Sequence, residues 1–189
     1  MPVARRAVVL FVPQPVAGLV DDIRRRWDPV MLGRIDAHVT LVHDVVDTAT
    51  ARRLVEEAAA ATAPFEITLT TAHCWTRAAN GVYLDVDDPT GGIEALHARL
   101  SALETPAWAR AGFRPHVTVV HGRTVDPELA DSAWAALCEV TFGWTIELAT
   151  IDVVELDELT GWRSVLRLPF ADDAAVDEKG LVARPRPRS

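Results

Sequence analysis

A six-residue pattern that occurs twice constrains this chain more than any other feature. Residues 38–43 read His-Val-Thr-Leu-Val-His, and residues 116–121 repeat them with Val in place of Leu at the fourth position. Each copy is short, rich in β-branched residues and alternates polar with apolar side chains, as a half-buried strand does. Because successive side chains of a strand point to opposite faces, the first histidine and the threonine of each copy share one face. The pattern predicts two similar strands, each with an aliphatic face for packing and an imidazole beside a hydroxyl.

The apolar patterns around the two copies predict the same order of elements, namely strand, helix, His-Val-Thr strand and helix. Around the first copy they place a strand at residues 7–12 and helices at 16–27 and 49–61. Around the second copy they place a hairpin of residues 74–76 and 82–86, and helices at about 88–103 and 127–138. Further strands are expected at 65–71, 144–156 and 162–170, the last two as a closing hairpin. Mixed helices and hairpins of this kind predict an α+β fold, with helices packed outside an antiparallel sheet in each half.

The size and charge of the chain limit its organisation and its partners. Its 189 residues suffice for one domain or two closely joined lobes, which we place at 1–170. The acidic and then Arg-Pro-rich segment 171–189 is expected to be a disordered tail. The net charge of −8 argues against a long nucleic-acid groove, because such grooves depend on accumulated Lys and Arg. A small phosphorylated ligand, held by a few local donors, remains compatible with this charge.

Cysteine usage and hydropathy indicate the compartment. The two cysteines, Cys74 and Cys138, form neither a disulfide framework nor a metal-type spacing. No apolar run is long enough to span a membrane, and the short run after Arg5 and Arg6 is broken by Pro13. A reduced, cytoplasmic protein without an obligate protein partner is therefore expected.

The two His-x-Thr copies together resemble the signature of the two-histidine phosphoesterase superfamily, in which His, any residue, Thr or Ser and an apolar residue occur twice. That superfamily includes bacterial 2′-5′ RNA ligase-like enzymes and RNA 2′,3′-cyclic phosphodiesterases. The resemblance covers about residues 7–170 and extends to the leads Ile35-Asp36-Ala37 and Phe113-Arg114-Pro115. It implies a two-lobed fold with pseudo-two-fold symmetry, in which both copies line a central cleft.

The resemblance also implies a role for four residues. By position, His38 and His116 become an acid–base pair, and Thr40 and Thr118 become hydroxyls that bind the phosphate. Opening a cyclic phosphodiester requires a base to take a proton from water and an acid to protonate the departing ribose oxygen. Histidine, with an ordinary pKa of about 6.5, serves either role near neutral pH. Two hydroxyl groups that donate hydrogen bonds to the non-bridging oxygens stabilise the transition state. The implied activity is a metal-independent opening of 2′,3′-cyclic phosphates, on an RNA end or a small nucleotide, with no cofactor.

Other residues near the two copies depart from the pattern of that family. In the RNA cyclic phosphodiesterases the first copy usually continues with aromatic-Leu-Gly and the second with Ala-Arg. Here the fifth position after each first histidine is again histidine, His43 and His121, and Arg123 is expected to substitute for the missing arginine. Three aromatic residues lie near expected strand ends that border the cleft, where a ring can stack on a base, and packing is the alternative role of each. They are Trp75, Tyr83 and Trp162.

The same residues leave alternative interpretations. Metal binding by His38 with His43, or by His116 with His121, is disfavoured because strand positions five apart point to opposite faces. We therefore expect no metal site. His43 and His121 are interpreted as strand-end residues that face a loop, with substrate binding alongside Arg123, Trp75 and Tyr83 as their candidate function. The alternatives to hydrolysis are a metal-dependent hydrolase, a non-catalytic module that binds a nucleotide or RNA end, and 2′-5′ RNA ligation as the reverse reaction.

Overall fold

The computed structural model describes residues 5–75, 81–103, 112–157 and 161–171. Its helices are α1 (Val16–Trp27), α2 (Ala49–Ala60), α3 (Gly92–Leu100) and α4 (Pro127–Leu137), and a 3-10 turn, η1 (Ser101–Leu103), follows α3. Its strands are β1 (Arg6–Phe11), β2 (His38–Val42), β3 (Phe65–Cys74), β4 (Val82–Asp87), β5 (His116–Val120), β6 (Thr141–Leu148), β7 (Thr150–Asp157) and β8 (Gly161–Pro169).

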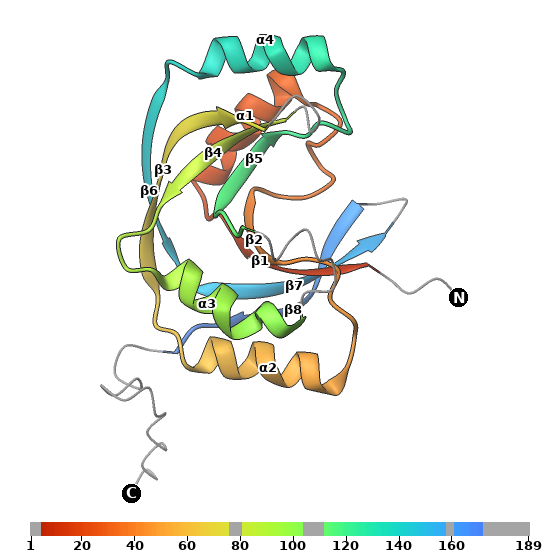
Figure 1. Cartoon of the computed structure of the whole chain (residues 1–189), viewed down its shortest axis with the longest axis vertical. Coiled ribbons are helices and arrows are strands. Elements are labelled where there is room, and N and C mark those ends of the chain that lie inside the picture. Colours follow the sequence, from red (N-terminus) through yellow and green to blue (C-terminus); the bar gives the residue numbers. More distant parts are fainter. Residues whose placement is uncertain (1–4, 76–80, 104–111, 158–160, 172–189) are drawn as a thin grey trace, which may run out of the picture.

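The eight strands form one antiparallel sheet in the order β6-β3-β4-β5-β2-β1-β7-β8. This order divides into two groups, which we call the first lobe (β2, β1, β7 and β8) and the second lobe (β5, β4, β3 and β6). The lobes meet where β2 pairs with β5, and the register there is a single pair, Val39 with Val117. Figure 1 shows the strands as a curved layer between the helices. The predicted α+β fold of two antiparallel halves is confirmed.

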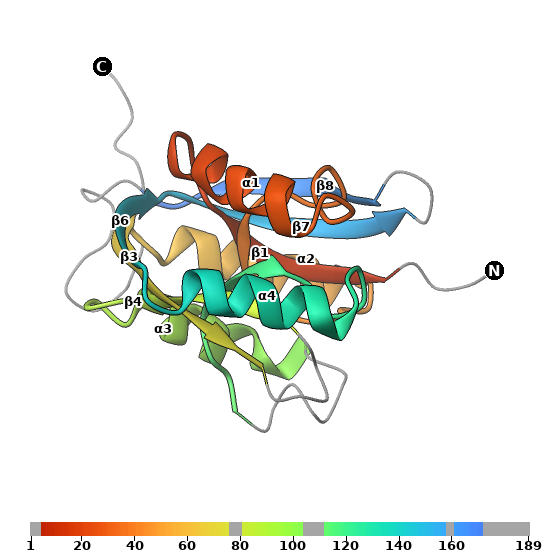
Figure 2. The same cartoon turned by 90° about the horizontal axis from the view of Figure 1, so that it is seen from above.

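Each lobe is covered by two helices. One follows a strand of the same lobe in the chain, and the other follows a strand of the other lobe. Helix α1, which follows β1 of the first lobe, packs on β5 of the second lobe and contacts α4. Helix α3, which follows β4 of the second lobe, packs on β2 of the first lobe and contacts α2. Figure 1 shows α1 with α4 at one end of the molecule and α2 with α3 at the other, and Figure 2 shows the same layers from above. The exchange of α1 and α3 interlocks the lobes.

The aliphatic faces of the two His-Val-Thr strands form the centre of the core. Val39 and Leu41 on β2, and Val117 and Val119 on β5, are at most 1% exposed and belong to one large cluster of buried residues. The histidine and threonine of each strand lie on the opposite, partly exposed face. Burial of the aliphatic face fixes the direction of the polar face, because a slip of one residue would exchange the two.

Helix ends follow the capping signals in the sequence. The hydroxyl of Thr48 accepts a hydrogen bond from the amide of Ala51 at 3.0 Å, at the start of α2. The carboxylate of Asp126 accepts one from the amide of Leu129 at 2.8 Å, at the start of α4, where Pro127 takes the first helical position. Each such cap is worth about 1 kcal/mol. The predicted helices α1, α2 and α4 are confirmed to within one residue at either end.

The structure corrects two expectations about the strands. The segment 144–156, expected as one strand, belongs to two, since β6 pairs with β3 of the second lobe and β7 pairs with β1 of the first. The chain crosses between the lobes at Ala149, and the alternation of polar and apolar residues carries no mark of this change of partner. The strand expected to end at Thr71 continues to Cys74 in β3, past an irregularity in its pairing. The predicted hairpin of β7 and β8 is confirmed.

Some expectations fall outside the described residues. They concern the turn at Asn80, the helix end at Pro106 and nearly all of the tail 171–189. The extent of the domain, 1–170, and the disorder of the tail therefore stay predictions.

Candidate active site

The two His-x-Thr segments lie side by side at the junction of the lobes. Because β2 and β5 run antiparallel with Val39 opposite Val117, His38 lies on the side of Thr118, and Thr40 lies on the side of His116. Each imidazole therefore lies toward the hydroxyl of the other strand. All four residues line one cleft of about 1090 Å³. The structure thus brings together the four residues that the repeated pattern singles out.

Both imidazoles are held in the same way by the main chain. The Nδ1 of His38 lies 2.8 Å from the carbonyl oxygen of Asp36, and the Nδ1 of His116 lies 2.7 Å from that of Arg114. A carbonyl oxygen only accepts, so Nδ1 carries the proton in both rings. In the neutral form of each ring, Nε2 is therefore the basic nitrogen that takes up or releases a proton. The leads Ile35-Asp36-Ala37 and Phe113-Arg114-Pro115 thus orient the two rings identically.

The proton affinity of both imidazoles is reduced. Burial lowers the pKa of His38 from 6.5 to about 4 against the hydrogen bond to the Asp36 carbonyl oxygen, which raises it. The charge of Arg24, and those of His116 and His43 when they are protonated, lower it further. Burial also lowers the pKa of His116, as do the charges of His43 and Arg114. The Asp85 carboxylate acts on His116 in the opposite direction and raises its pKa. The site therefore holds two neutral imidazoles at pH 7, and only His116 has a carboxylate that favours its charged form.

Aromatic side chains surround His116 on the side of the second lobe. The ring centroid of Trp75 lies 4.9 Å from that of His116, edge to face, and Trp75 lines the cleft. The expectation of a substrate contact for Tyr83 requires correction, because Tyr83 is 2% exposed and does not line the cleft. Its ring instead packs 4.3 Å from Trp75 and 5.3 Å from His116, behind the surface that a ligand would touch. Tyr83 is therefore a support for these two rings.

A charged pair lies next to the same rings. Arg114 donates to both carboxylate oxygens of Asp85 at 3.2 Å, and its guanidinium lies over the ring of Tyr83 at 5.3 Å from the centroid. Asp85 is the register partner of His116 in the β4–β5 pair. The lead into the second motif is thereby tied to the neighbouring strand, whereas on the first lobe the register partner of His38 is Phe11. The surroundings of the two histidines are therefore unequal.

The remaining histidines of the two copies also reach the cleft. Strand β2 ends at Val42 and β5 ends at Val120, so His43 and His121 lie beyond the regular strands. The alternation of side chains along a strand therefore does not direct them to the face opposite His38 and His116. His43 and His121 lie at the strand ends, as expected, and both line the cleft, where substrate binding stays a prediction. The Nδ1 of His121 accepts a hydrogen bond from the amide of Arg123 at 3.2 Å, and Arg123 lines the cleft as well.

Three features of the site have little or no signal in the sequence. The first is Arg24 of α1, which is fully buried and donates to main-chain carbonyls beside both motifs. The second is Asp28, also fully buried, which accepts from the amide of His121 at 2.8 Å and from the hydroxyl of Thr124 at 2.5 Å. The third is the segment 31–35, which lines the cleft. A charged residue on the buried face of a helix was the one available signal for Arg24.

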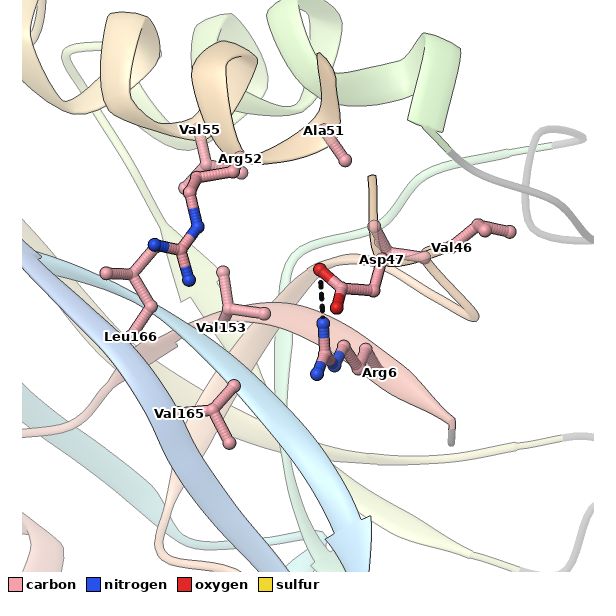
Figure 3. A pocket seen from close by; sticks show the side chains of 10 residues that line it. Arg6, Val46, Asp47, Ala51, Arg52, Val55, Val153, Val165 and Leu166 are labelled. Carbon is pink, nitrogen blue, oxygen red and sulfur yellow. Dashed lines mark ion pairs between the residues drawn. The ribbon is translucent and has the colours of Figure 1, made fainter. Parts of the chain in front are cut away.

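A second, smaller pocket lies away from the motifs. It has a volume of about 80 Å³, between α2 and the β7–β8 hairpin. Figure 3 shows that the ion pair of Arg6 with Asp47 lies in it, under Arg52 and Val55 of α2. Because these charges neutralise each other within the pocket, we assign it no ligand.

Among the described residues, no group of three or more His, Cys, Asp or Glu side chains is arranged to hold a metal ion. Of the helices that the structure describes, none is long and apolar enough to cross a membrane.

A known family matches the part of the chain that contains both motifs. Residues 12–160, well over half of the chain, match the family described as the 2′-5′ RNA ligase superfamily. The chain belongs to this superfamily. No curated protein sequence matches it.

Solved structures with the same fold agree with the membership in the 2′-5′ RNA ligase superfamily. TT0787 of Thermus thermophilus has a TM-score of 0.67 at 16% identity, over 89% of this chain and 99% of that one. E. coli LigT complexed with ATP has a TM-score of 0.63 at 18% identity, over 89% and 99% of the two chains. E. coli LigT complexed with 3′-AMP has a TM-score of 0.62 at 18% identity, over 90% and 99%. At these identities the likeness concerns the fold.

Proposed function

We propose that the chain is a metal-independent phosphodiesterase that opens 2′,3′-cyclic phosphates, with His38 and His116 as its acid–base pair. The observation that carries this proposal is that the two imidazole rings are oriented by equivalent hydrogen bonds. Each donates from Nδ1 to the carbonyl oxygen two residues earlier, which leaves both Nε2 atoms for proton transfer in one cleft. A protein that only binds nucleotides has no need for two titrating groups so arranged.

We base the roles of the pair on the unequal surroundings of the two rings. Burial lowers the pKa of His38 to about 4, so this ring stays neutral and acts as the base that takes a proton from water. The water oxygen forms a bond to phosphorus, and the bond from phosphorus to one ribose oxygen breaks. His116 in its protonated form, which the Asp85 carboxylate favours, donates its Nε2 proton to that departing oxygen. Thr40 and Thr118 donate to the non-bridging oxygens, where negative charge develops.

The relatives support a phosphorylated nucleotide as the ligand. Structures of E. coli LigT are described as complexes with ATP, NADP+, 3′-AMP and phosphate. We extend this class of ligand to the present chain as a small nucleotide or an RNA terminus. The net charge of −8 favours a short ligand over a long nucleic acid.

Ligation is a second candidate, and the name of the superfamily favours it. If a nucleoside 5′-hydroxyl takes the place of water, His38 removes the hydroxyl proton and the same ring opening forms a phosphodiester. Hydrolysis and ligation then differ only in the nucleophile, so the two share the residues of the site.

The experiment is hydrolysis of the four 2′,3′-cyclic nucleoside monophosphates and of a short RNA with a 2′,3′-cyclic end, in excess chelator. Wild type, His38→Ala and His116→Ala are compared, with His73→Ala as a histidine control that lies outside the cleft lining. We expect turnover in wild type and in the control, and a loss of at least about 10²-fold in each cleft variant. The position of the phosphate in the product identifies the leaving oxygen.

Three outcomes would contradict the proposal. Full activity in His38→Ala or His116→Ala would contradict the assignment of these two residues as the acid–base pair. Activity that disappears with chelator and returns with a divalent metal would instead indicate a metal-dependent hydrolase. Tight binding of nucleotides without turnover would leave a binding module.

A further inference from the structure

The four motif residues form two pairs, and each pair spans the junction of the lobes. The first pair is His38 of β2 with Thr118 of β5, and the second pair is Thr40 of β2 with His116 of β5. The register that joins these two strands is a single pair of residues. The ladder between β2 and β5 therefore restrains the distances within the two pairs only weakly, and other contacts across the junction are needed to fix them.

A buried arginine holds the first pair. Arg24 of α1 donates from Nη1 to the carbonyl oxygen of Ile35 and from Nη2 to that of Thr118, each at 2.8 Å. Ile35 stands three residues before His38. Helix α1 follows a strand of the first lobe and packs on β5 of the second. The side chain thus joins the lead into one histidine to the hydroxyl residue that lies beside it on the other lobe.

His97 of α3 is joined to the first motif strand. Its Nδ1 lies 2.8 Å from the carbonyl oxygen of Leu41, and because a carbonyl oxygen only accepts, Nδ1 is the donor. Leu41 falls between Thr40 and Val42, which both have register partners on β1, and the pairing is irregular at this point. The imidazole therefore holds the residue directly after Thr40 where the β1–β2 ladder is interrupted.

The same imidazole lies flat against the lead into the second motif. The ring centroids of His97 and Phe113 are 3.7 Å apart, and the two ring planes differ by 2°. Phe113 stands three residues before His116, at the position that Ile35 takes in the first lead. The next residue, Arg114, supplies the carbonyl oxygen to which Nδ1 of His116 donates. A shift of the Phe113 ring would therefore turn the imidazole of His116.

We propose that His97 is a positioning residue that holds the second pair, Thr40 and His116, across the lobe junction. It acts from α3 as Arg24 acts from α1, so that each exchanged helix carries one side chain for one pair. His97 is partly buried and lies outside the cleft lining, so it acts through its two contacts and not on the ligand. This inference rests on the proposed function, since it takes the two residues of the pair to act on one phosphate.

Two variants of the full chain separate the two contacts. His97→Asn keeps a donor near the position of Nδ1 but removes the ring that lies on Phe113. His97→Phe keeps a ring on Phe113 but removes the donor to Leu41. Arg99→Ala, an exposed residue of the same helix, is the control. For a 2′,3′-cyclic nucleotide we expect each His97 variant to lower kcat by about 10- to 10²-fold, as misplacement of a reacting group does, with KM changed by less than about twofold.

The site of each effect should differ between the two variants. In His97→Asn, an NMR spectrum of the histidine rings should show faster exchange of the Nδ1 proton of His116 with water, while that of His38 is unchanged. Phe113→Leu, which breaks the same stack and leaves α3 intact, should reproduce this result even if His97→Asn does not fold. In His97→Phe, the further change Thr40→Val should cost less kcat than it does in wild type, because the two act on the same group.

The spectra need no turnover, so they separate this inference from the proposed function. Wild-type kcat in both His97 variants, or an unchanged His116 signal in both His97→Asn and Phe113→Leu, would overturn the inference while hydrolysis by wild type still stands. Equal changes at His38 and His116 would indicate a general loosening of the fold and would overturn it as well. Absence of hydrolysis in wild type would overturn the proposed function, and the His116 signal would still decide whether His97 positions this ring.

Discussion

The Nη2 of Arg24 donates to the carbonyl oxygen of Thr118 at 2.8 Å, so that helix α1 is tied to the second motif strand. The Nη1 of the same side chain donates to the carbonyl oxygen of Ile35 at 2.8 Å, at the lead into the first motif. Arg24 is fully buried, and among the described side chains its Nε is a buried polar atom without a hydrogen-bond partner. One guanidinium therefore joins the backbone of both motifs.

Replacement of Arg24 by Met should weaken the fold and alter His38. It removes the Arg24 donor from two partly buried carbonyl groups, which costs about 2–4 kcal/mol of unfolding free energy. It also removes a positive charge that lowers the pKa of His38, so this pKa should rise. Urea denaturation and an NMR titration of His38 measure both effects, and Arg24→Lys, which keeps the charge, should retain the low pKa. The same titration in Arg24→Met and wild type would contradict the electrostatic role.

The pH dependence of kcat/KM should be bell-shaped and should lie on the acidic side of pH 6.5. His38 must be neutral to act as base, and its pKa of about 4 sets the rising limb. His116 must be protonated to act as acid, and its pKa lies below the ordinary 6.5, which sets the falling limb. The profile of kcat should lie at higher pH, because the bound phosphate anion favours both charged imidazoles. A plateau of kcat/KM extending above pH 8 would contradict the assignment.

Stability should fall as the pH drops from about 6.5 toward 4. The folded protein holds His38 and His116 with lowered pKa values, so in this range the unfolded chain binds more protons. The contribution is complete above pH 6.5 and is lost as the pH approaches the folded values. Thermal unfolding across this range measures it. The double variant His38→Gln with His116→Gln should show a smaller change, and an unchanged slope would contradict the linkage.

Loss of either motif hydroxyl should slow the chemical step more than it weakens binding. Thr40→Val and Thr118→Val keep the side-chain shape but remove a donor to the developing negative charge, which costs about 10²–10³ in kcat. KM should change much less. Thr145→Val, an exposed threonine on β6 that lies outside the cleft lining, is the control. Variants that raise KM with kcat intact would show that the hydroxyls bind the ground state equally well.

Gly161→Ala should destabilise the protein more than Gly33→Ala. Both glycines have a positive φ, +88° and +84°, which costs an alanine about 1–3 kcal/mol. Only Gly161 also has a neighbour in the way, the Arg34 carbonyl oxygen, whereas a Cβ at Gly33 would meet nothing within 4 Å. Comparison of the two thermal midpoints isolates the steric part. Equal losses would show that the contact of Gly161 with Arg34 yields without cost.

The repeated pattern carried most of what could be predicted. Its alternation fixes a buried aliphatic face, and this face turns His38 and His116 toward a common cleft. Helix ends were predictable because Thr48 and Asp126 cap them through local hydrogen bonds. Local signals of this kind lie within a few residues of one another and are legible in the chain itself.

What could not be predicted depends on contacts between distant segments. Nothing near Ala149 marks the crossing from one lobe to the other, because both partners of the long β6–β7 segment accept the same alternation. Tyr83 lies near a strand end, yet Trp75 and His116 cover it. The role of Asp28 depends on a hydrogen bond from the amide of His121, which lies 93 positions further along the chain. The sequence around Asp28 therefore does not predict it.

Helices α1 and α3 are exchanged between the two lobes, as helices are exchanged between the subunits of a domain-swapped dimer, but here both lobes belong to one chain. Each lobe provides a helix to the strands of the other lobe and receives one in return. Neither lobe would keep its full apolar cover if the other lobe were removed. We therefore expect the protein to melt in a single all-or-none transition, and two fragments separated between β3 and β4 to regain structure only when mixed.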